Sequence, residues 1–148
     1  MRIVSVSENL KIEKRVAITP EIAKKYIALG FEVVLSENYA EHLGMKDDEY
    51  TKVGAIISKN EKDIISSSDV IVQLGLPTDE KNSLIKENQT LVGVFNPYDN
   101  EDKIKELVKK NVNVFSLELL PRITRAQSMD ILSSQANLAG YKAVIESF

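Results

Sequence analysis

An open, mainly parallel twisted sheet with helices on both faces is the fold that this sequence predicts, and three observations support it. Short β-rich runs alternate with helical patterns along the chain, which is typical of βαβ units. The run at 69–74 carries β-branched residues in continuous series, which indicates a central strand buried on both faces. The chain has 148 residues, 43% of them hydrophobic, which suffices for one domain with its own core. We therefore expect residues 1–148 to form a single α/β domain of the Rossmann-like or flavodoxin-like type.

The first predicted helix has clear signals at both ends. Residues 2–7 form the opening strand, and a polar loop leads from it to Thr19, which occupies an N-cap position. Pro20 follows at the first helical position, and Glu21 adds a first-turn acid that complements the helix dipole. Gly30 ends this helix, because glycine readily adopts the left-handed conformation that closes a helix.

A second strand is expected directly after this helix, at 31–35, and the segment that follows it reads as irregular. Residues 38–50 show no sustained period and predict short helical turns. Within them, Tyr39 and His42 look like surface loop residues. A brief strand at 55–57 follows.

The middle of the chain predicts three further strands. A helical turn after Asn60 precedes the strand at 69–74, and a second central-looking strand covers 90–95. A helix from about 101–110 then leads to an extended run at 111–120. The alternation of strand and helix thus continues to the last third of the chain.

The C-terminal segment begins at a turn and continues as a long helix. Pro121 forces the preceding residue out of the helical region, Thr124 occupies an N-cap position, and Gln127 completes a capping box. One helix over 125–148 would span about 36 Å at ~1.5 Å per residue, so its distal end should project. The apolar side of that end consists of Leu138, Val144 and Ile145. Because exposed apolar side chains seek a partner, we expect dimers through that surface.

A polar stripe runs along the same helix, since residues at steps of three and four share one face. Its members are Gln127, Asp130, Ser134, Asn137 and Tyr141. Helix structure alone can explain part of the pattern, because Gln127 closes the capping box and Asp130 complements the dipole. Arg122 likewise fits a solvated turn residue. The residue pattern alone therefore leaves structural and functional roles open.

Chemistry-bearing residues gather where the predicted strands end, and ligands bind beyond the carboxyl ends of strands in an open parallel sheet. The residues at the strand ends are Ser7, Glu8, 75–77, 96–98 and 120–122. The loop after the first strand adds two cations, Lys14 and Arg15. We expect them to line one cleft. Arg15 is equally well explained as a surface or salt-bridged arginine, and Asn96 and Tyr98 as parts of an Asn-Pro turn. Their participation in the site stays open.

Composition and missing motifs exclude several classes of function. A net charge of −3 with both signs interspersed offers no basic surface for nucleic acid. The absence of cysteine excludes thiol chemistry, and a single histidine disfavours a His-based metal site. No apolar run approaches the ~20 residues that cross a bilayer and no signal peptide precedes Arg2, so we expect a soluble chain without membrane insertion. No G-x-G-x-x-G, P-loop or G-x-S-x-G occurs, so the chain lacks a phosphate cradle of its own.

Two motifs carry a resemblance to a known family. They are PRITRAQSMDILSSQANLAGYKAV at 121–144 and EKRVAITPE at 13–21. The first strongly resembles the NAD(H)-binding component of proton-translocating NAD(P) transhydrogenase, and the second is similar to that family and to its relative alanine dehydrogenase. The resemblance implies the first of two domains in the alpha subunit. The family's glycine-rich NAD-binding domain, absent from this chain, would follow Phe148, and the long C-terminal helix would be the crossover into it.

The resemblance also implies site residues. Arg122, Gln127 and Asp130 match the family's nicotinamide-site loop, with Ser133 nearby. Gln127 would hold the nicotinamide end of NAD(H) close to the NADP(H) ring bound on a partner component, while Arg122 and Asp130 would orient the ring by polar contacts. Hydride transfer needs reacting atoms roughly 3–3.5 Å apart, and the cofactors supply the chemistry. We therefore expect catalytic and cofactor-binding roles here without a metal, a general acid or a general base.

The assembly that the resemblance implies is larger than this chain. The full enzyme would couple hydride transfer between NADH and NADP+ to proton translocation, with the membrane and NADP-binding components on other segments or chains. We expect a homodimer, peripheral on the cytoplasmic face of the inner membrane. The chain alone should be catalytically inactive and bind NAD(H) weakly or not at all, because its phosphate cradle is missing.

Two alternatives remain. Alanine dehydrogenases carry a lysine two residues before the proline that ends the central strand, and a histidine after the next strand. This chain has Gly75 and Asn96 in those regions, and only Arg15 remains of the groups that imine reduction needs for proton donation and carboxylate binding. The other alternative is a non-catalytic binding or dimerisation module. A glycine-rich βαβ unit in the reading frame beyond Phe148 would favour the enzyme, and a stop codon the module.

Overall fold

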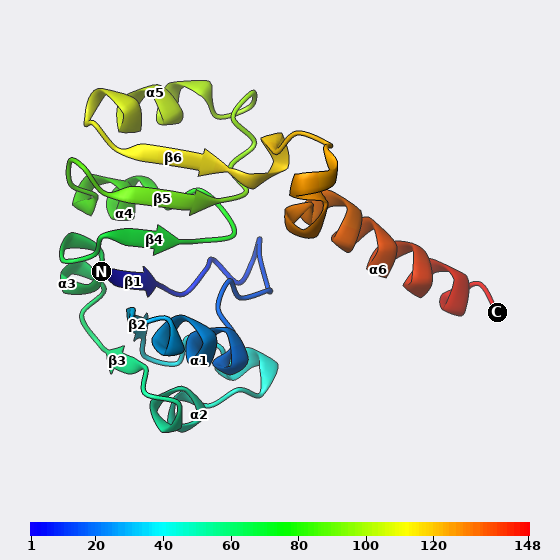
Figure 1. Cartoon of the computed structure of the whole chain (residues 1–148), viewed down its shortest axis with the longest axis horizontal. Helices are drawn as coiled ribbons and strands as arrows, with labels where there is room; N and C mark the ends of the chain where they lie inside the picture. The colour runs from blue at the N-terminus through cyan, green and yellow to red at the C-terminus, as the bar shows by residue number, and fades with distance from the viewer.

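The computed structural model describes all 148 residues and contains one sheet of six strands (Figure 1). The strands are β1 (Arg2–Ser5), β2 (Glu32–Ser36), β3 (Ile56–Ser58), β4 (Val70–Val72), β5 (Thr90–Gly93) and β6 (Asn113–Ser116). They lie in the order β3-β2-β1-β4-β5-β6, and every neighbouring pair is parallel. The predicted open α/β sheet is confirmed. Its strand order reverses between β1 and β4, which is the topological switch point where such sheets bind ligands.

Helices cover both faces of the sheet, as predicted. They are α1 (Pro20–Ala28), α2 (Asp47–Lys52), α3 (Glu61–Ser66), α4 (Asp79–Leu84) and α5 (Glu101–Lys109), whereas the sixth helix, α6 (Ile131–Glu146), covers neither face. Successive residues of a strand point to opposite faces, so Val34 joins one core cluster and Val33 joins the other. The first cluster contains Leu107 of α5 and the second contains Tyr50 of α2. Two apolar layers therefore hold the sheet, one on each side.

The predicted ends of α1 are confirmed. The Thr19 side chain accepts a hydrogen bond from the Ile22 N–H at 3.4 Å, and Pro20 is the first helical residue. Gly30 follows the helix with a φ of 88°, the left-handed region that a side chain would strain. These local signals determine where α1 begins and ends.

The prediction that Tyr39 is a surface residue is wrong, because its side chain is 1% exposed. Its hydroxyl lies 2.8 Å from Ser5 Oγ and accepts the N–H groups of Ala17 and Ile18 at 3.1 and 3.2 Å. The loop after β2 thus folds back over β1 and joins the core. His42 is exposed as predicted, with Nε2 2.7 Å from the Lys14 carbonyl oxygen.

One helix was not predicted. The helix α4 begins after Thr78, whose side chain accepts the Lys81 N–H at 3.5 Å. The signal was present in the sequence, since Thr78 is followed by the acids Asp79 and Glu80 in the first turn. This short helix matters for the site because it brings Lys81 to the carboxyl ends of the strands.

The C-terminal helix starts later than predicted, and the Thr124 capping box is wrong. Thr124–Met129 forms a 3-10 helix, and Asp130 is the N-cap of α6. Asp130 Oδ1 accepts the Ser133 N–H at 3.0 Å and Oδ2 accepts the Ser133 hydroxyl at 2.6 Å. Thr124 makes no capping hydrogen bond of its own, so Asp130 is the better cap. The helix has 16 residues and spans about 24 Å rather than 36 Å.

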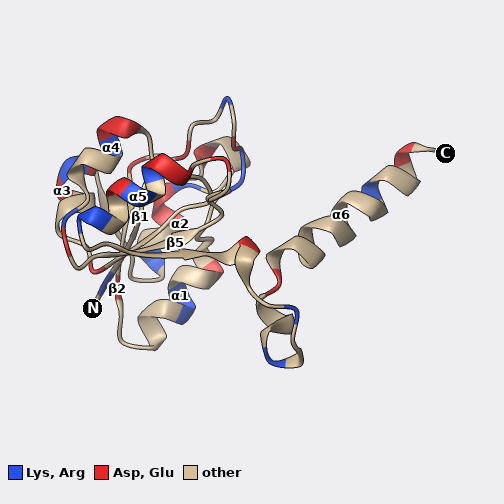
Figure 2. Ribbon diagram, turned by 90° about the horizontal axis from the view of Figure 1, so that it is seen from above, with Lys and Arg blue, Asp and Glu red and all other residues tan.

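The predicted projection of the distal end is confirmed. None of the residues of α6 is buried, and the helix extends away from the sheet (Figure 1). It carries few charges compared with the helices on the sheet (Figure 2). Its apolar side chains are largely exposed, with Leu138 at 60%, Val144 at 59% and Ile145 at 55%. No helix of the chain combines the length and apolarity that a bilayer crossing requires.

Candidate functional site

The predicted site residues of the C-terminal segment line one hollow of about 380 Å³. They are Arg122, Gln127, Asp130 and Ser133. The hollow lies where the 3-10 helix at Thr124–Met129 meets the first turn of α6. The break between the two helices therefore creates the concavity, because one straight helix would have carried these side chains along a convex surface.

Asp130 is the electrostatic centre of this hollow. The hydrogen bond from the Ser133 hydroxyl lowers the pKa of its carboxyl below the ordinary 3.8, and the Ser133 N–H and the charge of Arg122 act in the same direction. The carboxylate is therefore ionised at neutral pH. It offers a negatively charged acceptor next to a guanidinium donor.

Gln127 supplies a free amide at the same place. The side chain is exposed and makes no hydrogen bond within the chain, so both its donor and its acceptor are available. A second, adjacent hollow of about 420 Å³ shares Gln127, Asp130 and Ser133 and adds Ser134 and Asn137. Part of the predicted polar stripe thus extends the site along α6.

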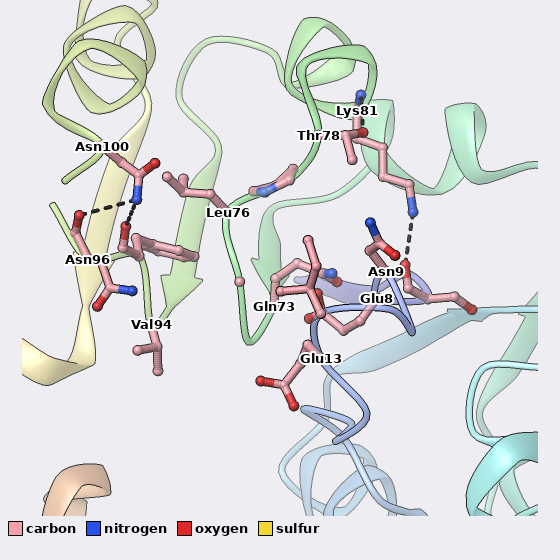
Figure 3. Close-up of a pocket in the computed structure, with 15 residues that line it drawn as sticks. Glu8, Asn9, Glu13, Gln73, Leu76, Thr78, Lys81, Val94, Asn96 and Asn100 are labelled. Atoms are coloured by element: carbon pink, nitrogen blue, oxygen red, sulfur yellow. Dashed lines mark hydrogen bonds between the residues drawn. The ribbon is translucent and has the colours of Figure 1, made fainter.

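A separate polar cleft of about 250 Å³ lies at the switch point between β1 and β4 (Figure 3). Its polar lining includes Ser7, Glu8, Gln73, Lys81, Asn96 and Asn100. The first two follow β1 and Asn96 follows β5, as the rule of carboxyl ends predicted. Gln73 and Lys81 were not predicted as site residues, although a glutamine in the apolar run at 69–74 is itself a signal.

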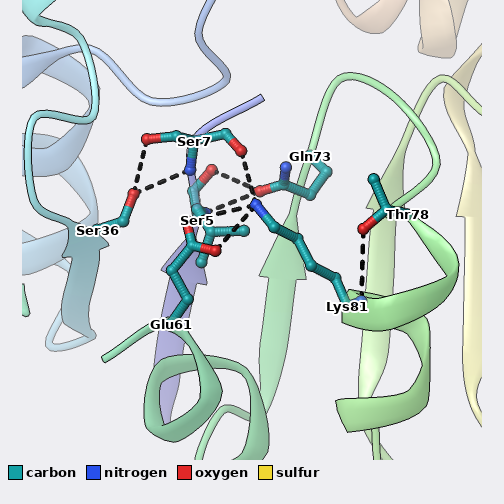
Figure 4. A network of polar contacts seen from close by, with 8 residues as sticks. Ser5, Ser7, Ser36, Glu61, Gln73, Thr78 and Lys81 are labelled. Atoms are coloured by element: carbon teal, nitrogen blue, oxygen red, sulfur yellow. Dashed lines mark hydrogen bonds and ion pairs between the residues drawn. The ribbon is translucent and has the colours of Figure 1, made fainter. Parts of the chain in front are cut away.

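The groups at the floor of the cleft largely satisfy one another (Figure 4). Lys81 Nζ donates to the Ser7 carbonyl oxygen at 2.9 Å and pairs with Glu61 at 3.1 Å. Gln73 Oε1 accepts the Val6 N–H at 2.9 Å and the Ser5 hydroxyl at 3.0 Å. The ammonium is thus held by protein groups rather than presented to a ligand.

Glu8 is the titratable group on the wall of this cleft. Its Oε1 accepts the Leu74 N–H at 2.6 Å. Burial raises the pKa of its carboxyl above the ordinary 4.5, and backbone hydrogen bonds from Leu74 and Gly75 only partly oppose the shift. The cleft therefore holds a carboxyl that gains a proton more readily than an exposed one.

The prediction that all strand-end residues line one cleft is wrong. Arg122 lines the hollow at α6 and not the switch-point cleft, and Tyr98 is 87% exposed and lines neither. The reason is the chain after β6, where a 3-10 turn at Leu117–Leu119 and an extended stretch carry Arg122 past the edge of the sheet. Asn96 does line the cleft, in a left-handed conformation with φ 44°.

Arg15 contacts α6 and does not line the switch-point cleft. Its Nη1 donates to Gln135 Oε1 of α6 at 2.8 Å, and its Nη2 pairs with Glu13 at 2.6 Å. Neither partner was predicted, and Gln135 is 120 residues away along the chain, beyond the reach of any local pattern. The contact ties the loop after β1 to the helix that forms the hollow.

The hollow at α6 brings together a carboxylate acceptor, Asp130, and an amide, Gln127, that can both donate and accept. A pyrophosphate requires a glycine-rich turn from a strand into a helix N-terminus. The loop between β1 and α1 has no such turn, because the first glycine of the chain is Gly30. The loop after β1 therefore lacks the glycine-rich turn that holds a pyrophosphate in dinucleotide-binding folds.

Comparison with known sequences shows the family of the chain. The family described as alanine dehydrogenase/PNT, N-terminal domain, matches residues 5–139. The chain is 44% identical over 151 residues to an NAD(P) transhydrogenase alpha subunit component of Rickettsia prowazekii, covering 99% of this chain and 39% of the relative. It is 25% identical over 145 residues to alanine dehydrogenase 1 of Staphylococcus aureus, covering 98% and 38%. The chain thus spans about two fifths of the length of these relatives.

Solved structures of a transhydrogenase and of an alanine dehydrogenase resemble this chain as well. The crystal structure of transhydrogenase from Sinorhizobium meliloti superposes with a TM-score of 0.90 at 40% identity, over 97% of this chain and 43% of that one. An L-alanine dehydrogenase shares the fold, with a TM-score of 0.75 at 20% identity, over 80% of this chain and 32% of that one. Both the matched residues and the identities lead to one assignment. The chain belongs to the alanine dehydrogenase/PNT N-terminal domain family, as the N-terminal domain of a transhydrogenase alpha subunit.

Proposed function

We propose that this chain forms one wall of the NAD(H) site in an NAD(P) transhydrogenase alpha subunit. The observation that supports it best is the hollow of about 380 Å³ lined by Arg122, Gln127, Asp130 and Ser133. These residues come from a 3-10 turn and a helix start, and they combine a cation, an amide, a carboxylate and a hydroxyl. Such a set can bind both polar groups of a carboxamide.

Each residue would have a distinct part in holding the nicotinamide end. The bound cofactor supplies the hydride chemistry, and the protein supplies orientation. The Asp130 carboxylate, fixed by Ser133, would accept the carboxamide N–H, and the Gln127 amide would hold the opposite side. Arg122 would donate to polar groups of the cofactor from the wall of the hollow. Fixing the ring in this way brings the reacting carbons into a near-attack geometry, which is the main contribution that this chemistry needs from protein.

The rest of the assembly is included in the same proposal. NADP(H) would be bound on a partner component, and membrane components would translocate the protons. The names of the relatives, which are subunits rather than whole enzymes, support a complex of several components. We propose a homodimer, peripheral on the cytoplasmic face of the inner membrane, that uses the exposed apolar side chains of α6, among them Leu138 and Ile145.

An NADH titration tests the proposal directly. We expect this chain alone to bind NADH weakly or not at all, and a version extended through the glycine-rich domain to bind it well, because the phosphate cradle dominates affinity. In the extended version with the partner components added, Gln127→Asn should lower hydride transfer from NADH to an NADP analogue while NADH affinity stays nearly intact. Submicromolar binding by this chain alone, or unchanged transfer in the variant, would contradict the proposal.

Alanine dehydrogenation is the second candidate, and the switch-point cleft argues against it. The cleft presents Gly75 and Asn96 where that chemistry uses a lysine and a histidine, and its own ammonium, Lys81, is occupied by Ser7 and Glu61. The cleft retains the carboxyls of Glu8 and Glu13, but neither the lysine nor the histidine that imine reduction uses in that family. Alanine-dependent reduction of NAD+ by the extended version would favour this candidate.

A further inference from the structure

The C-terminal segment is attached to the rest of the fold by few polar contacts. Residues 121–148 make no backbone hydrogen bond to residues 1–120. They make one side-chain hydrogen bond, from Arg15 Nη1 to Gln135 Oε1 at 2.8 Å. None of the residues of α6 is buried, although the helix contacts the turn at Leu117–Leu119. The direction of α6 therefore depends on a small number of interactions, among which the Arg15 contact is specific.

The guanidinium is oriented before it meets the helix. Glu13 accepts Arg15 Nε at 2.9 Å and Nη2 at 2.6 Å, and its Oε1 also accepts the Arg15 backbone N–H at 2.9 Å. The hydrogen bond from the Arg15 side chain lowers the pKa of the Glu13 carboxyl, so this partner stays charged at neutral pH. One edge of the planar group is thus fixed on Glu13, which leaves Nη1 directed at α6. A lysine cannot bind two partners in this fixed geometry.

Gln135 lies close to the residues of the proposed nicotinamide site. It follows Ser133 by two residues and the N-cap Asp130 by five, within the first turns of α6. Any change in the direction of α6 therefore moves the side chains that line the hollow. Because misplacement by about 1 Å can cost a hydride-transfer site much of its rate, the contact has a functional consequence.

We propose that Arg15 is a positioning residue, which acts through Gln135 to hold α6 in the direction that places Asp130 and Ser133 against the cofactor. The structural half of this inference concerns the helix direction and does not depend on the cofactor. The functional half rests on the proposed function of the hollow. A distance measurement tests the helix direction, and a kinetic measurement tests its effect on hydride transfer.

The first measurement reads the helix direction in this chain. The chain has no cysteine, so spin labels at Lys62→Cys on α3 and Ala143→Cys on α6 report one distance. We expect a broader distance distribution in Arg15→Ala, Arg15→Lys and Gln135→Ala, and no further broadening in the double alanine variant, because both changes remove the same bond. Lys25→Ala removes the pair with Glu21 on α1, which carries neither label, and serves as the matched control, with an unchanged distribution. An unchanged distribution in Arg15→Ala would overturn the inference.

The second measurement reads the function in the complete transhydrogenase complex. Arg15→Ala should lower the kcat of hydride transfer about tenfold with KM for NADH changed less than about twofold, as expected when an orienting contact rather than a binding contact is lost. Gln135→Ala should show the same pattern. If the distance distribution broadens while kcat stays unchanged, the positioning role is overturned and the proposed function is not. Hydride transfer by Gln127→Asn, assayed in parallel, tests the proposed function independently of Arg15.

Discussion

Glu118 and Asn96 join the ends of two neighbouring strands, because Glu118 Oε1 accepts the Asn96 backbone N–H at 2.5 Å. The same oxygen accepts the Phe95 N–H at 2.8 Å. Asn96 has a φ of 44°, in the left-handed region that asparagine adopts more readily than most residues, and these two bonds contribute to holding that conformation at the wall of the switch-point cleft. A carboxylate on one strand end thus shapes the turn that follows the next strand.

Replacing Glu118 tests this relationship. Glu118→Ala leaves two backbone donors without their acceptor, so we expect a loss of roughly 1–3 kcal/mol in the free energy of unfolding, measured by urea titration. Glu118→Gln keeps the Oε1 acceptor, and Oε2 has no partner to lose. The glutamine variant should therefore lose less than the alanine variant. Equal losses in both variants would show that the charge, rather than the acceptor geometry, holds the turn.

Gly93 is expected to be the glycine least tolerant of a side chain. A Cβ at Gly93 would lie 2.0 Å from the Gln73 carbonyl oxygen and 2.6 Å from the Phe95 ring, and the backbone oxygen cannot move aside cheaply. We expect Gly93→Ala to lower the free energy of unfolding by about 3 kcal/mol or more. Gly140→Ala is the matched control, since nothing lies within 4 Å and α6 gains a better helix former. Thermal unfolding of both variants should shift in opposite directions.

Tyr39→Phe isolates the contribution of one buried hydroxyl. The change leaves the N–H groups of Ala17 and Ile18 without their acceptor, while the Ser5 hydroxyl keeps only its hydrogen bond to Gln73. The expected loss in the free energy of unfolding is about 1–3 kcal/mol. Tyr98→Phe, at a side chain that is 87% exposed, should change it by less than ~0.5 kcal/mol. Similar values for the two variants would contradict the role of Tyr39 as a link between β1 and the loop after β2.

Glu8 makes stability depend on pH with a defined sign. Its folded-state pKa is raised by burial, so its contribution is present in full below the unfolded value of 4.5 and is lost as the pH rises through the folded value. Glu8→Gln cannot titrate. The free energy of unfolding of the wild type minus that of Glu8→Gln should therefore be larger at about pH 3 than at about pH 7. Asp130→Asn should give the opposite sign, because the pKa of Asp130 is lowered, and its stability contribution is lost on acidification.

Sequence patterns predicted the sheet and α1 because the information there is local. Thr19 and Pro20 start α1 by their own chemistry, and the β-branched run at 69–74 marks a buried strand wherever it is placed. The burial of Tyr39 could not be predicted in the same way, since it depends on Ser5, 34 residues away. The contact between Arg15 and α6 likewise depends on a distant residue, because Gln135 is 120 residues away.

The start of α6 could not be predicted for a different reason, which is that the sequence offers two N-cap candidates. Thr124 and Asp130 both satisfy the N-cap rule, so the local pattern cannot choose between them. Asp130 prevails because Ser133 donates to it twice, from the backbone and from the hydroxyl. The hollow that gathers the predicted site residues is a consequence of this choice. The grouping of those residues was therefore predictable from the sequence, and the concavity was not.

Asp130 has two separable roles, as a helix cap and as a ligand-binding carboxylate. Asparagine is as good an N-cap as aspartate, whereas alanine is poor, so Asp130→Asn should keep the helix and Asp130→Ala should fray it, as measured by far-UV circular dichroism. If the carboxylate also orients the nicotinamide, both variants should lower hydride transfer in the complete complex by at least about tenfold. Full activity in Asp130→Asn together with loss in Asp130→Ala would assign Asp130 to the cap alone, and would leave Gln127 and Arg122 as the groups that hold the ring.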